Sequence, residues 1–170
     1  MGIINDKNSF VHCMCVGVDD AGYVNTKKKS SYVEKLIDTI GDEIHFGLLK
    51  QENYDLVLTT IKNNFLNNNY MDPDLYYRAF EEYFDVNVYV YSPDAIMDIP
   101  RYKVFHTRPV RKDRRTLLIY KHKNGHCELI VNKYSDPNKV IIFDEDMTVY
   151  CHHFFQNIIN VLTFSILVKN

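Results

Sequence analysis

A helix that runs directly into a strand is encoded between residues 72 and 91. Asp72 can cap a helix, and Pro73 suits the first helical position because that position needs no N–H donor. Asp74 then lies near the positive end of the helix dipole. The apolar side chains that follow share one helical face: Tyr76, Ala79, Phe80 and Tyr83. Residues 86–91 read Val-Asn-Val-Tyr-Val-Tyr, and this β-branched and aromatic run predicts a strand.

A hairpin is expected later in the chain, around the Asn-Gly pair at residues 124–125. This dipeptide tolerates the positive φ angles that tight hairpin turns require. The turn separates a predicted strand over residues 116–120 from a returning strand over residues 126–132. Because neighbouring strands joined by a short turn run in opposite directions, this pair predicts an antiparallel ladder.

The remaining periodic segments define the fold class. We expect one helix that starts near residue 32 and ends at Gly41, and another over residues 56–65. A short strand over residues 140–143 and a mostly apolar stretch over residues 147–167 follow. Helices therefore come first and a small, mostly antiparallel sheet afterwards. This order predicts a single α+β domain over residues 1–170 rather than alternating βαβ units.

Composition narrows the function classes. The 170 residues can bury one continuous core, and the net charge of −2 does not favour a globally basic nucleic-acid-binding protein. No apolar run approaches the roughly 20 residues needed to cross a bilayer, and no secretory signal is recognisable. Four cysteines are too few for a disulfide scaffold. We therefore expect an intracellular protein without a membrane partner.

Two short segments carry residue types suited to nucleophilic catalysis. Residues 6–13 form a polar turn that leads into an apolar helix, and residues 125–131 place a histidine at the start of a strand. Side chains two positions apart on a strand point to the same side, so Glu128 can lie beside His126 and orient it. A cysteine hydrolase needs a nucleophile at a helix N-terminus and a histidine that arrives from elsewhere in the fold.

These segments resemble two signatures of the OTU (ovarian tumour) family of cysteine deubiquitinases. Residues 6–10, Asp-Lys-Asn-Ser-Phe, are similar to the family's Asp-Gly-Asn-Cys-Leu/Phe motif, and residues 126–128, His-Cys-Glu, to its His-aromatic-Asn/Asp segment. Residues 80–91 resemble the family's intervening helix and strand. The resemblance spans residues 6 to about 132 and is greatest to OTU-like domains of large DNA viruses. It implies a papain-like OTU fold.

The resemblance also implies roles for individual residues. Ser9 occupies the nucleophile position, His126 the base position and Glu128 the orienting position, while Asp6 lies where some OTU proteins keep a supporting aspartate. Backbone N–H groups around residues 6–9, including those of Lys7 and Asn8, would stabilise the oxyanion. The implied reaction is acyl transfer that cleaves ubiquitin or ubiquitin-like conjugates, with no cofactor and no metal.

Three departures bear on activity. Ser9 stands where the family has cysteine, Lys7 replaces the glycine and Cys127 replaces the aromatic residue. A serine hydroxyl ionises far less readily than a thiol, so we expect little turnover. Ser9 is then either an engineered substitution in a working protease or the native residue of a pseudoenzyme that binds ubiquitin as a scaffold. Alternatively, Cys13, one helical turn further on, is the nucleophile.

Two other site types fit less well. Cys13-Met14-Cys15 and Cys151-His152-His153 contain potential zinc ligands, but their spacing is not that of zinc sites. The basic residues 108–115 lack interleaved aromatic residues and are typical of a solvated loop, and a nucleic-acid-associated module that uses them is a third, weaker hypothesis. The sequence indicates neither an oligomeric state nor a preference for one ubiquitin linkage, and the chain could be part of a larger protein. A viral source would place it in the host cytoplasm or the virion.

Overall fold

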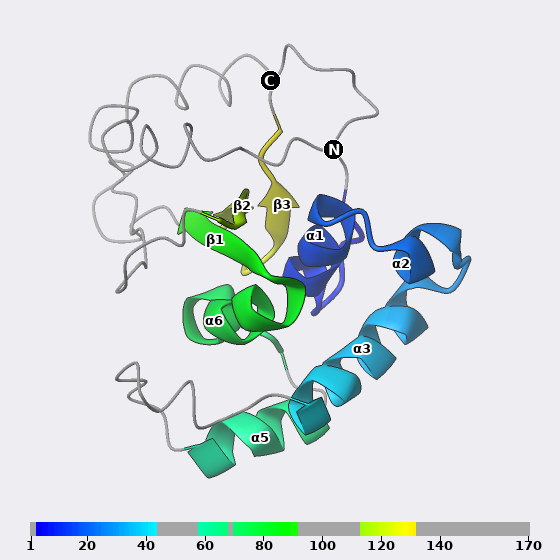
Figure 1. Ribbon diagram of the computed structural model, residues 1–170, viewed down its shortest axis with the longest axis vertical. Helices are drawn as coiled ribbons and strands as arrows, with labels where there is room; N and C mark the ends of the chain where they lie inside the picture. Colours follow the sequence, from blue (N-terminus) through cyan, green and yellow to red (C-terminus); the bar gives the residue numbers. More distant parts are fainter. Residues whose placement is uncertain (1–2, 44–57, 68–69, 92–112, 132–170) are drawn as a thin grey trace.

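The computed structural model describes residues 3–43, 58–67, 70–91 and 113–131. It has a mixed α+β architecture in which the helices lie below and to the right of a three-stranded sheet (Figure 1). The helices are α1 (Ser9–Gly17), α2 (Ala21–Asn25), α3 (Lys29–Glu43), α5 (Leu58–Leu66) and α6 (Pro73–Phe84). The strands are β1 (Val86–Tyr91), β2 (Arg115–Lys121) and β3 (Cys127–Leu129). The predicted strand over 140–143, the apolar stretch over 147–167, residues 108–112 and residues 151–153 lie outside the described residues.

The start of α6 confirms the local prediction. The Asp72 side chain accepts a hydrogen bond from the Asp74 N–H at 3.0 Å, and Pro73 occupies the first turn. The helix ends at Asp85, which adopts the left-handed conformation with φ 52°. This tight reversal lets β1 begin at the next residue and pack back against α6.

The sheet is mixed, which corrects the expectation of a mostly antiparallel one. The strand order is β1-β2-β3, with β1 and β2 parallel and β2 and β3 antiparallel. The predicted hairpin is confirmed, and Gly125 has a φ of 84° in its turn. Residues 92–114 separate β1 from β2, and a connection of that length allows the chain to return and start the next strand at the same end of the sheet.

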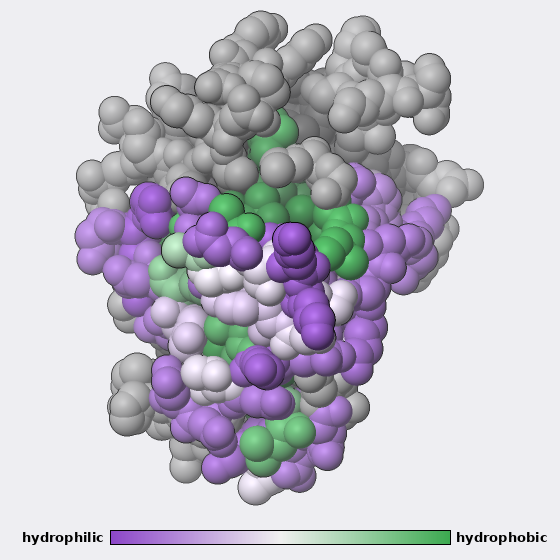
Figure 2. All heavy atoms as spheres, turned by 90° about the vertical axis from the view of Figure 1, so that its right-hand side faces the viewer, coloured by the Kyte–Doolittle hydropathy of each residue, from purple (hydrophilic) through white to green (hydrophobic). Residues whose placement is uncertain are grey.

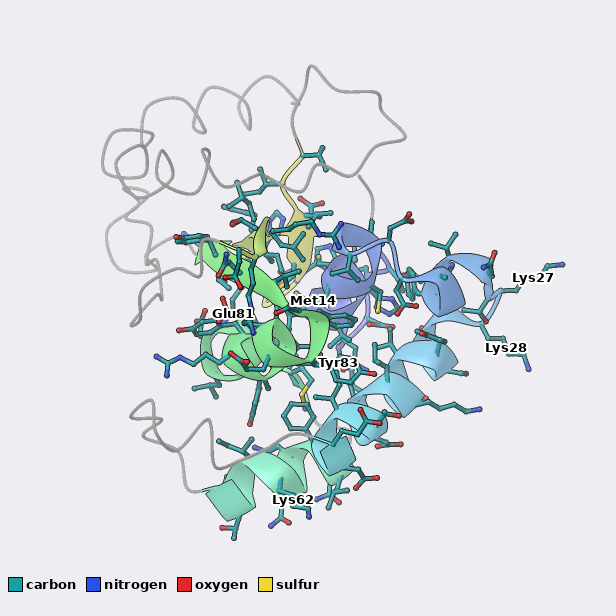
Figure 3. All side chains as sticks on the ribbon, viewed as in Figure 1. Met14, Lys27, Lys28, Lys62, Glu81 and Tyr83 are labelled. Atoms are coloured by element: carbon teal, nitrogen blue, oxygen red, sulfur yellow. The ribbon has the colours of Figure 1, made fainter. Side chains whose placement is uncertain are left out.

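Buried polar groups fix the corner where α6, β1 and β2 meet. The buried Glu81 side chain accepts the Val88 N–H at 2.7 Å, and Figure 3 shows Glu81 on α6 near β1. Arg114 binds both carboxylate oxygens of Glu82, at 3.2 and 3.1 Å, and one oxygen of Asp85 at 2.6 Å. These contacts hold the end of the helix against the first residues of the two parallel strands.

An aromatic chain joins the helices beneath the sheet. Phe10 of α1 meets Phe80 of α6 edge to face with ring centroids 5.1 Å apart. Phe65 of α5 packs between Phe80 and Tyr76, at centroid distances of 5.9 and 5.6 Å. Because Phe10 is fully buried and packs on Phe80, the first turn of α1, which contains Ser9, is anchored to α6.

The outer surfaces of the helices are polar. Helix α3 buries one apolar stripe and exposes charged residues on its other side, such as Glu34 and Asp38. Figure 2, which views the right-hand side of Figure 1, shows hydrophilic residues over much of this face with separate hydrophobic groups among them. Lys27, Lys28 and Lys62 are exposed and point away from the body in Figure 3. Among the described residues, no helix is both long and apolar enough to cross a membrane.

Gly41 does not end its helix, contrary to the sequence prediction. Helix α3 continues through it to Glu43. A Cβ atom at position 41 would lie 2.8 Å from the Cβ of Phe65, so glycine here allows α3 and α5 to approach closely. The glycine signal that indicated a helix end therefore reflects tertiary packing.

We expect Gly41→Ala to destabilise the fold. Alanine gains about 1 kcal/mol of helix propensity over glycine, but overpacking against Phe65 costs about 1–3 kcal/mol. The net change should lower the midpoint of chemical denaturation, whereas the exposed α3 substitution Lys35→Ala should leave it nearly unchanged. An alanine variant as stable as the original chain would show that Phe65 can move aside at little cost.

Candidate functional site

Asp6 organises the loop that precedes α1. Its Oδ1 accepts the Asn8 N–H at 2.8 Å, and its Oδ2 accepts the Ser30 hydroxyl at 2.9 Å. The same Oδ2 lies 3.0 Å from Nε2 of His12, a fully buried residue of α1. One carboxylate therefore connects the loop, α1 and α3, and its position is set by these three contacts.

His12 is part of this network, although sequence reasoning gave it no role. Its Nδ1 and the Tyr23 hydroxyl are joined by a hydrogen bond of 2.8 Å, so the buried ring is bonded at both nitrogens. Burial acts to raise the pKa of Asp6, but the Asn8 N–H, Ser30 and His12 outweigh it and lower that pKa below its ordinary value. Only the i, i+6 spacing of Asp6 and His12 could have indicated the pair, and that spacing is not specific.

Ser9 lies at the first position of α1 and against β3. Its side chain is buried, with 1% of its surface exposed, and its Oγ accepts the backbone N–H of Cys127 at 3.0 Å. Figure 1 shows α1 alongside β3. The structure thus brings the Ser9 hydroxyl next to the peptide that links His126 to Cys127, across 118 positions of sequence.

His126 borders a cavity beside this contact. The cavity has a volume of about 470 Å³ and is lined by the loop before α1, the hairpin turn and Tyr70. The backbone N–H of His126 donates to Oδ1 of Asn124 at 3.0 Å, which fixes the main chain at the cavity wall. Within the described residues, Nδ1 of His126 is buried without a hydrogen-bond partner, and no hydrogen bond joins its ring to Ser9.

Glu128 pairs with a different histidine from the one that the sequence indicated. Its Oε2 lies 3.0 Å from Nε2 of His122, at the other side of the hairpin. The His122 ring stacks on that of His126, with centroids 5.7 Å apart and planes inclined by 26°. Sequence reasoning missed His122, although its position three residues before the Gly125 turn places it opposite His126.

The cysteines near the site are buried thiols. Cys13 lies one turn after Ser9, as expected, but burial raises its pKa well above the ordinary value, and the neighbouring Cys127 adds to this. Burial also raises the pKa of Cys127 to about 12, against the opposing effects of Lys121 and a hydrogen bond with Ser9. A reactive cysteine needs a lowered pKa and access to solvent, so the surroundings of Cys13 do not favour it as a nucleophile.

The backbone around the predicted oxyanion site is largely engaged within the loop. The Asn8 N–H donates to the Asp6 side chain, and the Ser9 N–H donates to the Asp6 carbonyl oxygen at 3.2 Å. Asn8 is buried at the cap position of α1, whereas the side chain of Lys7 is exposed and lines the cavity. An oxyanion could receive the Asn8 or Ser9 N–H only if these local hydrogen bonds rearranged.

Metal binding has no support in the part of the chain that the structure describes. No group of three or more His, Cys, Asp or Glu side chains there could hold a metal ion. Cys13 and Cys15 are both free thiols buried in α1.

Comparisons with known proteins give one distant relative. The chain is 26% identical over 92 residues to "Uncharacterized protein 295L" of Invertebrate iridescent virus 6. The match covers 54% of this chain but only 7% of the viral protein. No family model matches the chain, and no solved structure matches it.

The Asp6 network predicts a pH-dependent contribution to stability. The pKa of Asp6 is lowered in the folded state, so the carboxylate stabilises the fold above its unfolded pKa of about 4, and this contribution is lost as the pH falls through the lower folded value. Asp6→Asn should therefore reduce Tm at neutral pH, and the difference from the original chain should close at acidic pH. The exposed Asp38→Asn should show no such pattern, and a gap independent of pH would contradict this role of the charge.

The contact between Ser9 and Cys127 predicts the effect of removing the hydroxyl. Ser9→Ala leaves the buried Cys127 N–H without its acceptor, which should lower the free energy of unfolding by about 1–3 kcal/mol. Amide hydrogen exchange at Cys127 should become faster. The exposed Ser31→Ala serves as the control, and unchanged exchange at Cys127 in Ser9→Ala would show that the hydrogen bond contributes nothing.

Proposed function

We propose that this chain is an OTU-like domain of the cysteine-protease class, with Ser9 at the nucleophile position, which binds ubiquitin or a ubiquitin-like protein with little turnover. One observation carries this proposal. The backbone N–H of Cys127 donates to Oγ of Ser9, so the two segments that resemble OTU motifs are in contact, and this contact supports the proposal. The papain-like fold is part of the same proposal.

The arrangement supports acyl-transfer chemistry when a thiol is present. Position 9 lies at the N-terminus of α1, where the helix dipole favours a thiolate. His126 lies at the cavity wall beside it and would take the proton of the nucleophile and return it to the leaving amine. The cavity of about 470 Å³, which is lined by His126 and by the loop that precedes position 9, would receive the C-terminal tail of the modifier.

Serine at position 9 favours binding over cleavage. Its hydroxyl is buried and already accepts a backbone N–H, and a hydroxyl forms an anion much less readily than a thiol. The surrounding groups therefore hold the two motifs together without an activated nucleophile. This observation favours the pseudoenzyme over an active serine hydrolase. The Ser9→Cys substitution distinguishes a catalytically inactive scaffold from a protease that lacks only its thiol.

We expect Ser9→Cys to form a covalent adduct with ubiquitin that carries a C-terminal electrophile, while the original chain and Ser9→Ala do not. The adduct should appear in intact-mass spectra, and adding Cys13→Ala to Ser9→Cys should leave its yield unchanged. The original chain should bind unmodified ubiquitin in calorimetry, with no free product released from conjugates.

The outcomes separate the two forms of the proposal. Binding by the original chain without labelling of Ser9→Cys would leave only the scaffold function. Absence of both binding and labelling would refute an OTU-like ubiquitin site. Labelling that requires Cys13 would move the nucleophile to that residue.

A further inference from the structure

His122 lies opposite His126 in the β2–β3 hairpin. Lys121 pairs with Cys127 in the register, and the His122 N–H donates to the His126 carbonyl oxygen at 2.8 Å, just beyond the regular ladder. Tyr120 is the register partner of Glu128. Because side chains alternate along a strand, three rings and one carboxylate share one face of the hairpin: those of Tyr120, His122, His126 and Glu128.

The side chains on this face form a continuous series of contacts from Glu128 through His122 to His126. Oε2 of Glu128 binds Nε2 of His122 at 3.0 Å, and the His122 ring stacks on the His126 ring. Tyr120 packs edge to face against His122 from the other side, with centroids 4.7 Å apart and planes at 89°. His122 is therefore held by a carboxylate and two rings, and it lies between Glu128 and His126.

No hydrogen bond among the described residues sets the orientation of the His126 ring. Its Nδ1 is buried without a partner in the described part of the chain, whereas its main chain is held by hydrogen bonds with Asn124 and His122. The stacked His122 ring is the contact that restrains the plane of the His126 imidazole. The orientation of His126 therefore depends on the orientation of His122.

We propose that His122 is a positioning residue through which Glu128 orients His126. The carboxylate fixes His122 by the hydrogen bond to Nε2, and His122 fixes His126 by stacking. The catalytic meaning of this arrangement rests on the proposed function, because it concerns the proposed base. The arrangement itself is a property of the hairpin and is tested without activity.

The exposure of the pair makes the test practical. The side chains of His122 and Glu128 are 39% and 47% exposed, and ion pairs with this exposure contribute little to folding stability. His122→Phe keeps a ring that can stack on His126 but removes the nitrogen that binds Glu128. Glu128→Gln keeps the shape of the side chain but removes its charge. Both variants should therefore fold.

The first experiment follows the imidazole resonances of His126 by NMR in the full chain with Ser9 unchanged. Glu128→Gln should shift these resonances, and the same substitution in a His122→Phe background should no longer shift them. Glu34→Gln, at an exposed position of α3, should have no effect in either background. Shifts of equal size with and without His122 would overturn the proposal, because Glu128 would then act on His126 directly.

The second experiment measures the rate of labelling by the ubiquitin electrophile in a Ser9→Cys background. Loss of a charge-assisted hydrogen bond corresponds to about a tenfold change, so Glu128→Gln should slow labelling by about tenfold when His122 is present. It should have no further effect in the presence of His122→Phe. Equal slowing in both backgrounds would overturn the proposal. If Ser9→Cys is not labelled at all, the protease form of the proposed function fails, and the NMR result still decides the role of His122.

Discussion

The hydrogen bond from the Cys127 N–H to Oγ of Ser9 is the contact on which the site depends. It joins the first turn of α1 to the first residue of β3. Neither group is exposed, so an alternative arrangement would leave a buried N–H without an acceptor. The aromatic packing of Phe10 behind Ser9 fixes the helix from the other side. Together these constraints hold the loop before α1 and the β2–β3 turn at the two walls of one cavity.

Two separate polar networks stabilise the two segments that line this cavity, the loop before α1 and the β2–β3 hairpin. Asp6 ties the first wall to His12 and Ser30, and the lowered pKa of Asp6 indicates that its charged form is the one that the fold selects. Glu128 and His122 set the second wall through the hairpin register. The two carboxylates were both expected near the proposed base, yet each is bound to another histidine. The loop and the hairpin are therefore each held by a carboxylate and a histidine, and His126 of the hairpin borders the cavity with Nδ1 unpartnered among the described residues.

The features that the sequence predicts well are local. Asp72 and Pro73 begin α6 as their capping chemistry requires, and Gly125 forms the hairpin turn because it adopts a positive φ. Features set by distant contacts were not predictable in the same way. Gly41 has the same chemistry as a helix-ending glycine, but its role is determined by Phe65 on another helix. The parallel pairing of β1 and β2 and the partner of Glu128 depend on sheet order and register, which residue spacing alone does not specify.

The identity of residue 9 links access to the site with the stability of the fold. A nucleophile must turn a lone pair toward a carbonyl carbon, but the Ser9 oxygen directs its acceptor capacity to the Cys127 N–H. The oxygen has a second lone pair, but turning it toward a carbonyl carbon would weaken the bond to the buried Cys127 donor, and the hydroxyl must also lose its own proton. Sulfur is a much weaker acceptor than oxygen, so a thiol at this position would be held less firmly and could turn into the cavity at lower cost. Serine therefore strengthens the contact between α1 and β3 and is at the same time a poor nucleophile, and both properties support the proposed binding function over cleavage.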